Sequence, residues 1–335
     1  MTRSTITRPR CDIVLLVDQE TGLRTAGGAF SVDRSSVESQ VLRALRLQHL
    51  HVVVVPYDPE PGVTVAELRA RDPLLVFNLT EWIDGARNRD HEIAALLERL
   101  DFRYTGTGPA GLRLCRDKVK VNGIAARQGL EVPRNFVIKA GQRVPASPLG
   151  YPLFVKPAQG DGSDHIGKKS LVRNAHELRE RVRVLRARNA EPVLCEEYIA
   201  GRDVFVALLG NAPKVLQALE LVVGRAGTQA PCFATARLKH NVPYQRHWQV
   251  RYRDVVLPIS VKKAIRTACV RLFGALHLRD YARLDFRLTP DNRLVFIEAN
   301  PNPDLGQHTF GRNRCFAGVP YADLIACIVK AARRR

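Results

Sequence analysis

The sequence predicts an α/β protein built from two or three domains. The chain has 335 residues, 45% of them hydrophobic, which is long enough to bury a sizeable core. In the first hundred residues, short apolar runs alternate with stretches of helical spacing, and this alternation predicts a parallel sheet covered by helices. No apolar run approaches the ~20 residues that a membrane-spanning helix needs, so we expect no membrane segment.

The N-terminal elements follow from these patterns. Strands are predicted at residues 12–17, 52–55 and 74–79, and helices at residues 37–47 and 91–100. Ligands of parallel sheets gather at the carboxyl ends of the strands. We therefore expect the loop at Gly27-Gly28 and the segment Asn78–Glu81 to face a shared cleft.

Two glycine-rich segments match phosphate-binding patterns only in part. Gly106-Thr-Gly-Pro-Ala-Gly111 has the letters of a dinucleotide fingerprint but lacks the preceding strand and the following acid. It predicts an interdomain turn, with a dinucleotide site as the alternative. Gly162 to Lys169 nearly spells a P-loop, but Lys169 stands where Ser or Thr is required. The glycines of the loop Gly160–Gly167 still allow backbone amides to approach a phosphate.

The remaining elements are predicted by the same reasoning. Helices are expected at 117–130, 174–188, 261–275 and 320–332, and the second of them begins with a capping pair, Asn174 and Glu177. A polar loop at 233–243 carries Lys239. Strands are expected at 135–138, 153–156, 169–172, 193–199, 204–209, 215–223, 281–288 and 294–297.

The segment Arg293–Asp304 carries the clearest chemistry. Its apolar strand is followed by Glu298 and Asn300, whose spacing on an extended chain points both side chains to one face. Their oxygens are ligands of the kind that Mg²⁺ prefers, and the hairpin predicted for the last two strands places Asp285 beside Glu298. The alternative is a strand that ends in a polar turn with unconnected side chains.

Three lysines on separate elements, Lys118, Lys156 and Lys239, suit phosphates as point charges. Together with the oxygen ligands they indicate a magnesium–nucleotide site that does not use a P-loop.

Charge and cysteine usage narrow the function classes. The net charge of +19 comes mostly from 41 arginines, which are spread along the whole chain. A solvated basic surface or a polyanionic partner would both explain it, but the aromatic residues are few and not interleaved with the arginines, so the composition does not favour nucleic acid. Seven cysteines with no C-x-x-C pair, and an apolar run at 13–17 too short for a signal peptide, are typical of a reduced cytoplasmic protein without a zinc cluster.

Five motifs, in this order, resemble the ATP-grasp superfamily and, within it, the D-alanine–D-alanine ligase-like branch. They are Asp117-Lys118, Leu153-Phe-Val-Lys-Pro157, Cys195-Glu-Glu-Tyr-Ile-Ala-Gly201, Ala282-Arg-Leu-Asp-Phe286 and Phe296-Ile-Glu-Ala-Asn-Pro301. The resemblance covers nearly the whole chain. It implies an N-terminal α/β domain at 1–108 and an α+β ATP-grasp part with a central subdomain at 109–194 and a C-terminal subdomain at 195–335.

The resemblance also implies a role for each matching residue. Lys118, Lys156 and Lys239 would hold the nucleotide phosphates, with Gly162 and Ser163 in the phosphate loop. Glu196, Glu197, Tyr198 and Ile199 would surround the adenine, and Asp203 would bind the ribose. Asp285, Glu298 and Asn300 would ligate one or two Mg²⁺ ions, with Mn²⁺ as a substitute. Arg283, Lys239 and Ser163 would serve catalysis, with Arg283 steadying the intermediate.

The implied reaction joins a carboxylate to an amine. ATP would convert the carboxylate to an acyl phosphate, because an amide cannot form with hydroxide as the leaving group, and the amine would then displace phosphate. The loops 160–167 and 233–245 would act as lids that exclude water.

Departures from the family pattern bear on the substrates. The family's Ser-Ser-Val-Gly-like run reads Ser163-Asp-His-Ile-Gly167 here, and Asp304 stands where the family has the glycine that meets the second substrate's carboxylate. An acid there repels a carboxylate, so we expect an amine at that place. The substrate residues implied are Asp33, Glu81, Arg283, Asp304 and Thr309.

The sequence therefore favours a ligase for amino acids or a small metabolite. The alternatives are a ligase that modifies an acidic protein or peptide, D-alanine–D-alanine ligation for the cell wall, and a nucleic-acid-binding module. The branch is usually dimeric, so we expect a homodimer that acts on small molecules.

Overall fold

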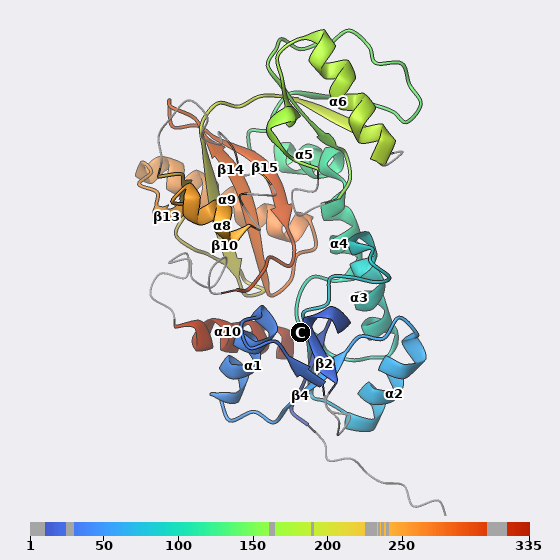
Figure 1. Ribbon diagram of the computed structural model, residues 1–335. Coiled ribbons are helices and arrows are strands. Elements are labelled where there is room, and N and C mark those ends of the chain that lie inside the picture. The colour runs from blue at the N-terminus through green and yellow to red at the C-terminus, as the bar shows by residue number, and fades with distance from the viewer. Residues whose placement is uncertain are drawn as a thin grey trace, which may run out of the picture.

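The structure is a computed structural model that describes residues 11–24, 30–160, 165–188, 191–224, 233, 235, 238, 241–306 and 320–335. Figure 1 shows the N-terminal domain at one end, the sheet that contains β10, β14 and β15 in the middle, and a small subdomain with α6 at the other end. None of the described helices is long and apolar enough to cross a membrane. The mixed α/β fold class predicted from the sequence is confirmed.

A three-stranded parallel sheet forms the centre of the N-terminal domain. Its order is β4 (Val52–Pro56), β1 (Ile13–Val17) and β5 (Leu75–Asn78), and all five residues of β1 are buried. This is the parallel sheet that the alternating pattern predicts. The hairpin β2 (Gly22–Arg24) and β3 (Phe30–Val32) and the helices α1 (Val37–Arg46), α2 (Pro61–Arg71) and α3 (Asp90–Arg99) complete the domain.

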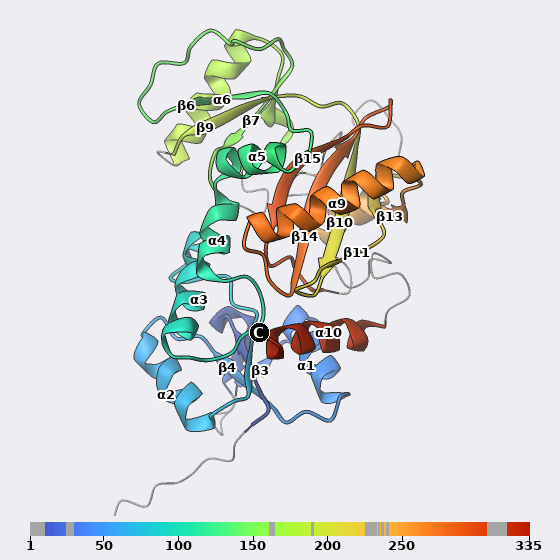
Figure 2. The ribbon, with the colours of Figure 1, turned by 180° about the vertical axis from the view of Figure 1, so that it is seen from behind.

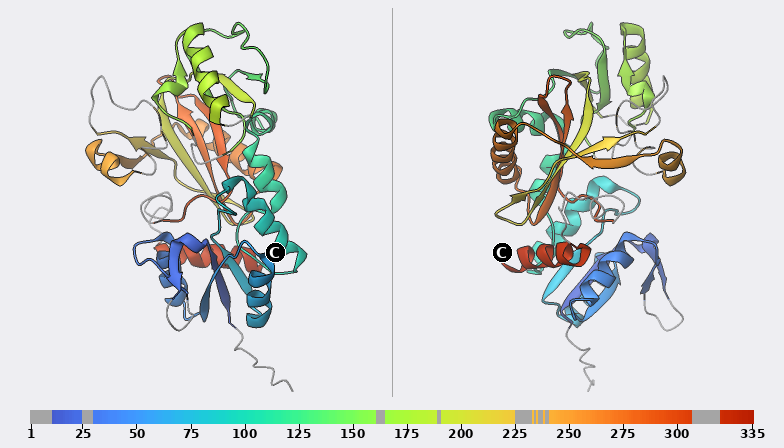
Figure 3. Two further views of the ribbon diagram at one scale, coloured as in Figure 1. Left: turned by 45° about the vertical axis from the view of Figure 1, so that its right-hand side comes forward. Right: turned by 90° about the vertical axis from the view of Figure 1, so that its left-hand side faces the viewer.

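The last helix returns to this domain. α10 (Tyr321–Arg333) packs Leu324, Ile325 and Ile328 into one core with Ile13, Val41 and other N-terminal residues. Figure 3 shows α10 lying between the N-terminal domain and the C-terminal sheet. The ends of the chain are therefore tied together through apolar contacts, which hold the two halves of the molecule against each other.

A small antiparallel sheet forms the central subdomain. The chain reaches it through Gly106–Gly108 and the helices α4 (Pro109–Arg116) and α5 (Lys118–Arg127). The sheet order is β6 (Asn135–Ile138), β9 (Val193–Glu197), β7 (Leu153–Pro157) and β8 (Leu171–Val172), and α6 (Ala175–Arg188) covers it. Gly106–Gly108 precede the helix, but Pro109–Gly111 form the first residues of α4, so the turn predicted over Gly106–Gly111 is wrong for its second half.

The C-terminal sheet has the order β13, β12, β10, β14 and β15, with β11 paired to β10. Its strands are β10 (Arg202–Leu209), β11 (Lys214–Val215), β12 (Leu219–Val222), β13 (Arg251–Asp254), β14 (Tyr281–Leu288) and β15 (Leu294–Asn300). The helix α9 (Ile259–Ala275) covers the rear face, as Figure 2 shows, and the short helix α8 (Val242–His247) precedes β13. The opposite face is left for the site.

Some predicted boundaries are wrong. The strand expected at 169–172 begins with a 3-10 turn at Lys168–Ser170, because the Ser170 amide donates to the Gly167 carbonyl, so only Leu171 and Val172 form β8. The strand expected at 215–223 is broken into β11 and β12. The sequence analysis did not predict the helices α2, α4 and α8 or the strands β2, β3 and β13. Four residues of β13 are exposed, so it carries no apolar pattern.

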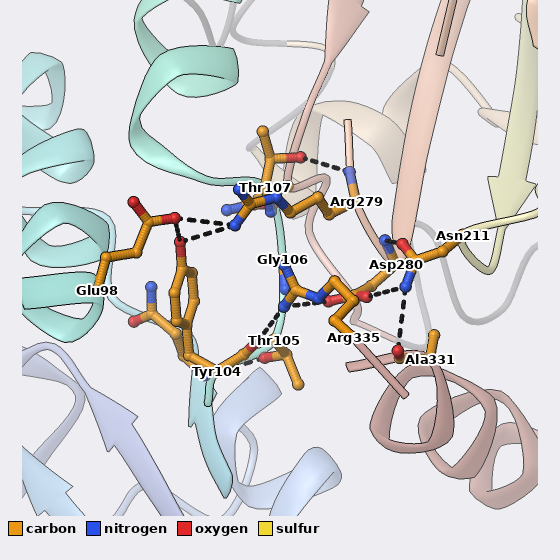
Figure 4. Close-up of polar contacts among 12 residues, drawn as sticks. Glu98, Tyr104, Thr105, Gly106, Thr107, Asn211, Arg279, Asp280, Ala331 and Arg335 are labelled. Atoms are coloured by element: carbon orange, nitrogen blue, oxygen red, sulfur yellow. Dashed lines mark hydrogen bonds and ion pairs between the residues drawn. The ribbon is translucent and has the colours of Figure 1, made fainter. Parts of the chain in front are cut away.

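A polar joint links the N-terminal domain to the C-terminal sheet (Figure 4). The Asp280 carboxylate is fully buried and accepts hydrogen bonds from the Gly106 amide at 2.8 Å and the Asn211 side chain at 3.0 Å. Arg335 forms an ion pair with it at 3.2 Å. Burial raises the pKa of Asp280, although Arg335 and the donors act to lower it. These contacts fix β14 relative to the first domain.

Candidate active site

The first cavity lies between the two antiparallel sheets, and most of the predicted nucleotide residues line it. β7 supplies Lys156, and β9 with the residues after it supplies Glu196 to Ile199. β10 supplies Asp203, and the hairpin of β14 and β15 supplies Asp285 and Glu298. Residues from five different strands of the chain therefore surround one space.

The most buried polar feature of this cavity is an ion pair. The Lys156 ammonium lies 2.7 Å from Glu196, and their side chains are 2% and 3% exposed. Asn122 donates a second hydrogen bond to Glu196 at 3.1 Å. A buried lysine needs such a partner because the cost of removing its charge from water is large. The pair places the Lys156 ammonium and the Glu196 carboxylate together at the wall of the first cavity.

Other predicted nucleotide residues are held by neighbours. Arg287 binds the Asp203 carboxylate at 2.8 Å and donates to the Ile199 carbonyl at 3.1 Å. The Glu197 carboxylate pairs with Arg134 at 2.7 Å, and the Glu197 amide donates to the Arg134 carbonyl at 2.9 Å. These contacts fix the shape of the strand end at which the resemblance places the adenine.

Lys118 lies at the start of α5, where it is buried. Its ammonium donates to the Gly160 carbonyl, and its backbone amide donates to the Ala158 carbonyl at 3.1 Å. Lys118 therefore connects α5 to the glycine loop after β7. It does not line the first cavity. Gly162, Ser163, Lys239, Thr309 and the Gly27-Gly28 loop lie outside the described residues.

The hairpin of β14 and β15 brings the predicted metal ligands together. Asp285 pairs with Glu298 and Arg283 pairs with Asn300 in its register, which confirms the predicted proximity of Asp285 and Glu298. A bulge follows Asp285, and such irregularities re-aim side chains near sites. Two carboxylates and an amide oxygen are hard donors that fit Mg²⁺ held mainly by a nucleotide. The buried Asn300 amide nitrogen has no hydrogen-bond partner among the described residues; as a donor it would bind an anionic oxygen and not the metal itself.

Arg283 is held by Asp285, one of the predicted metal ligands. Its guanidinium binds Asp285 through two hydrogen bonds of 2.7 and 3.0 Å and lies over the Phe205 ring at 5.0 Å. Burial alone would lower the pKa of Arg283, but Asp285 and Glu298 outweigh it and raise that pKa. The side chain therefore stays charged at the boundary between two cavities.

A second cavity of about 560 Å³ lies between the N-terminal domain and the C-terminal sheet. Arg283 and Asn300 line this cavity, whereas their strand neighbours Asp285 and Glu298 line the first. Phe205 lines both. The hairpin thus carries polar groups from the first cavity, predicted to bind the nucleotide, into this second cavity, here called the substrate chamber.

Some of the predicted substrate residues line the substrate chamber and one does not. Glu81, Arg283 and Asp304 line the substrate chamber. Asp33 does not line it: its exposed carboxylate accepts hydrogen bonds from Ser35 ahead of α1, and these bonds lower its pKa. Its position favours a turn-forming role.

Asp18 is a chamber residue that the sequence analysis missed. It follows β1 directly, and the rule that ligands gather at the carboxyl ends of parallel strands could have identified it. Its carboxylate accepts from the Glu81 and Trp82 amides at 3.0 and 3.2 Å. Burial first, and then the nearby Glu81 and Glu20 charges, raise its pKa to about 7 against the opposing effect of the amides.

Two antiparallel sheets around one cavity, with Lys156 from one sheet and Asp285 and Glu298 from the other, are the arrangement of the ATP-grasp class of ligase. Comparison with known proteins places the chain within it. Residues 138–330 match the family model for the D-ala D-ala ligase C-terminus, and the chain belongs to the D-alanine–D-alanine ligase family. It is an ATP-dependent ligase that forms a peptide bond.

Relatives cover most of the chain. It is 32% identical over 277 residues to an uncharacterized protein of Sinorhizobium fredii, covering 79% of this chain and 76% of that protein. It is 29% identical over 317 residues to the D-alanine–D-alanine ligase of Caulobacter vibrioides, covering 92% of both. The D-alanine–D-alanine ligase of Bordetella petrii is 29% identical over 276 residues, 80% of this chain and 79% of that one.

Solved structures share the fold. The D-alanine–D-alanine ligase of Bacillus anthracis complexed with ATP aligns with a TM-score of 0.72 at 18% identity, over 96% of this chain and 97% of that one. The VanG D-Ala:D-Ser ligase of Enterococcus faecalis aligns with a TM-score of 0.66 at 17% identity, over 96% and 100%. The relatives favour D-alanine–D-alanine ligation, which the sequence analysis placed below other ligase reactions.

Proposed function

We propose that this protein is an amino-acid ligase of the D-alanine–D-alanine ligase type, which uses Mg-ATP to activate the carboxylate of a small amino acid such as D-alanine and joins it to the amine of a second substrate. The observation that carries the proposal is the β14–β15 hairpin. Asp285 and Glu298 face the nucleotide cavity, and Arg283 and Asn300 face the substrate chamber. A phosphoryl group would have to cross this short distance.

The charges along that path suit the reaction. Lys156 and Lys118 would offset the phosphate charge, and Asp203 would orient the nucleotide. Mg²⁺ held by Asp285, Glu298 and Asn300 would neutralise charge on the transferred phosphoryl group. Arg283 would stabilise the oxyanion that forms when the amine attacks the acyl phosphate, because its guanidinium is fixed by Asp285 before the substrate arrives.

The test is ADP release and dipeptide formation with Mg-ATP and D-alanine, followed by mass spectrometry of the product. Arg283→Ala is expected to lower kcat by about 100-fold to 1,000-fold, as removal of an oxyanion donor does. Arg283→Lys keeps the positive charge but loses the two parallel hydrogen bonds to Asp285. Its kcat should therefore lie between that of the parent protein and that of Arg283→Ala. Arg183→Ala, which removes an exposed arginine of α6, is the matched control. If kcat of Arg283→Ala is unchanged, Arg283 does not stabilise the oxyanion.

The acidic-protein alternative has less support. Among the described residues that line the substrate chamber there are six carboxylates and two arginines, a lining that does not favour an acidic peptide. A nucleic-acid-binding module would have no use for the paired cavities. The expected homodimer and cytoplasmic location belong to the proposal, as do the domain limits 1–108, 109–194 and 195–335.

A further inference from the structure

The outer face of α9 is basic and contains no acid. The helix packs Cys269, Leu272 and Phe273 against the rear of the C-terminal sheet, and Figure 2 shows it lying on the outside of that sheet. Its sequence holds lysines and arginines but no aspartate or glutamate. All of its basic side chains are exposed, and they are Lys262, Lys263, Arg266 and Arg271.

The cations of the first two turns are not paired within the protein. Lys262, Lys263 and Arg266 form no ion pair or hydrogen bond through their side chains with the rest of the chain that the structure describes. Among the elements that contact α9 are β11 and α5, and neither contains an acid. The charge of these three side chains is therefore available to a partner outside the chain.

The neighbouring strands do not supply the missing counter-charge. Glu220 of β12 lies on the sheet face that α9 covers, where it is held by Arg202 and, at 3.1 Å, by Arg253. Asp254 of β13 lies on the other face, because side chains alternate along a strand. Two arginines thus accompany the acid beside the start of α9.

Aliphatic side chains project next to these cations. Val256 and Ile259, at the start of α9, are 88% and 85% exposed, although Val255 and Leu257 between and before them are buried. Val270 is also exposed and follows Arg266 by four residues, so it lies on the same side of the helix. Contact of these side chains with water is unfavourable. We call this region the α9 surface, and it comprises Val256, Ile259, Lys262, Lys263, Arg266 and Val270.

An anionic lipid bilayer matches both parts of the α9 surface. Its headgroups attract lysine and arginine, and the boundary between headgroups and acyl chains accepts aliphatic side chains. A nucleic-acid duplex would bind the cations through its phosphates but would leave Val256 and Ile259 in water. A second copy of the chain, docked through the same face, would bring two sets of cations together.

We infer that the α9 surface docks this protein on a bilayer that contains phospholipids with anionic headgroups. The association is reversible and sensitive to salt, because it uses a few side chains and no membrane-spanning segment. It leaves the nucleotide cavity accessible: on β10, Asp203 and Phe205 line that cavity, whereas Val204 and Val206 pack with α9. The inference goes beyond the proposed ligase function and does not depend on it.

The test is flotation of the full chain with vesicles. Vesicles of phosphatidylglycerol and phosphatidylcholine in equal parts are compared with vesicles of phosphatidylcholine alone. We expect binding to the anionic vesicles only, and we expect it to weaken about tenfold or more when the salt concentration rises from about 0.1 M to about 1 M. Absence of binding at the lower salt concentration would overturn the inference.

Variants of the cations locate the contact. Lys262→Gln/Lys263→Gln should weaken binding to the anionic vesicles about 25-fold, which is about fivefold for each lysine near an anionic surface. Arg46→Gln/Arg69→Gln is the matched control, since it removes two charges from exposed positions of α1 and α2. Equal weakening in the two double variants would show that only the overall charge matters and would overturn the inference.

Variants of the aliphatic side chains separate a bilayer from other partners. Ile259→Ser should weaken vesicle binding about threefold to tenfold, because the side chain no longer gains from leaving water. Leu47→Ser, at an aliphatic side chain of the N-terminal domain that is 72% exposed, should have no effect. The affinity for ATP should be unchanged in every variant, which shows that each is folded.

Two other outcomes would also overturn the inference. If the chain binds a DNA duplex more tightly than anionic vesicles, and Ile259→Ser changes neither affinity, the α9 surface serves nucleic acid. If analytical centrifugation without lipid shows a dimer that Ile259→Ser dissociates, the surface is a contact between copies of the chain.

Discussion

The ion pair of Lys156 and Glu196 bears on both the stability of the fold and the binding of a nucleotide. Both side chains are almost fully buried, so each charge depends on the other. A nucleotide phosphate would offer Lys156 a second partner. The pair is therefore a point at which stability and nucleotide binding are coupled.

Breaking this pair should be costly. Lys156→Met leaves Glu196 buried without its cation, and we expect the free energy of unfolding to fall by about 3–5 kcal/mol. The double variant Lys156→Met/Glu196→Gln should recover much of that loss, because Asn122 can still bond to the amide. Urea denaturation of the parent protein, of Lys156→Met, of Glu196→Gln and of the double variant measures the coupling free energy between the two side chains. The exposed pair Arg183–Glu180 is the control and should contribute under about 1 kcal/mol. The prediction is contradicted if the loss of unfolding free energy in the double variant equals the sum of the losses in the two single variants.

Asp18 makes stability depend on pH. Its pKa is raised from 3.8 to about 7 in the folded chain. Below about pH 4 the carboxyl is protonated in both the folded and the unfolded chain, so it does not make the stability depend on pH. Between about pH 4 and pH 7 only the folded chain holds the proton, so this group's contribution to stability is lost as the pH rises.

The variant Asp18→Asn removes this dependence. We expect its stability relative to the parent protein to increase by about 2.6 kcal/mol between pH 5 and pH 8, as measured by urea denaturation at both values. The asparagine oxygen can still accept from the Glu81 and Trp82 amides. A difference that stays constant with pH would show that Asp18 titrates normally.

Among the elements, α6 begins as the sequence predicts. Asn174 accepts from the Glu177 amide at 2.9 Å, and Glu177 accepts from the Arg173 amide at 2.8 Å. The two side chains satisfy amides that the first turn leaves without partners. The pattern was readable because a capping pair is local, four residues from end to end.

Asn174→Ala should destabilise the protein by about 1 kcal/mol, the usual effect of losing an N-cap. Chemical denaturation measures it, and Glu180→Gln on the exposed face of the same helix should change stability by under about 0.5 kcal/mol. If the two variants behave alike, the cap contributes nothing specific.

The β14–β15 hairpin was predictable for a similar reason. A two-residue period and a short turn at Thr289–Asn292 determine which residues are opposite, so Asp285 and Glu298 could be paired from the sequence. The bulge after Asp285 could not be predicted, because it depends on the strands packed around it.

At the scale of the whole molecule, the joint at Asp280 holds the substrate chamber together. It connects Gly106 before α4, Asn211 after β10 and Arg335 at the end of α10. Arg279 adds contacts to Thr107 at 3.2 Å and Glu98 at 2.9 Å. The two walls of the chamber come from the two sides of this joint.

Asp280→Ala should lower the free energy of unfolding by about 3 kcal/mol, because two donors and an arginine lose a buried acceptor. Arg335→Gln should cost about 1 kcal/mol, since Asp280 keeps its other donors. Arg334→Gln, at the exposed neighbouring position, is the control. Thermal and urea unfolding measure all three, and an unaffected Asp280→Ala would show that apolar packing alone holds the domains.

The sequence by itself determined the ATP-grasp class, the order of its motifs and the hairpin that carries Arg283, Asp285, Glu298 and Asn300. The class and the motif order follow from the resemblance of five short motifs to that superfamily, and the hairpin follows from local periodicity, which is visible over a few residues. Only the tertiary structure brought Asp18 and Glu38 to the same chamber as Asp304 and placed α10 against β1. Those residues are far apart in the chain, and their proximity results from apolar burial between elements, which no local pattern encodes.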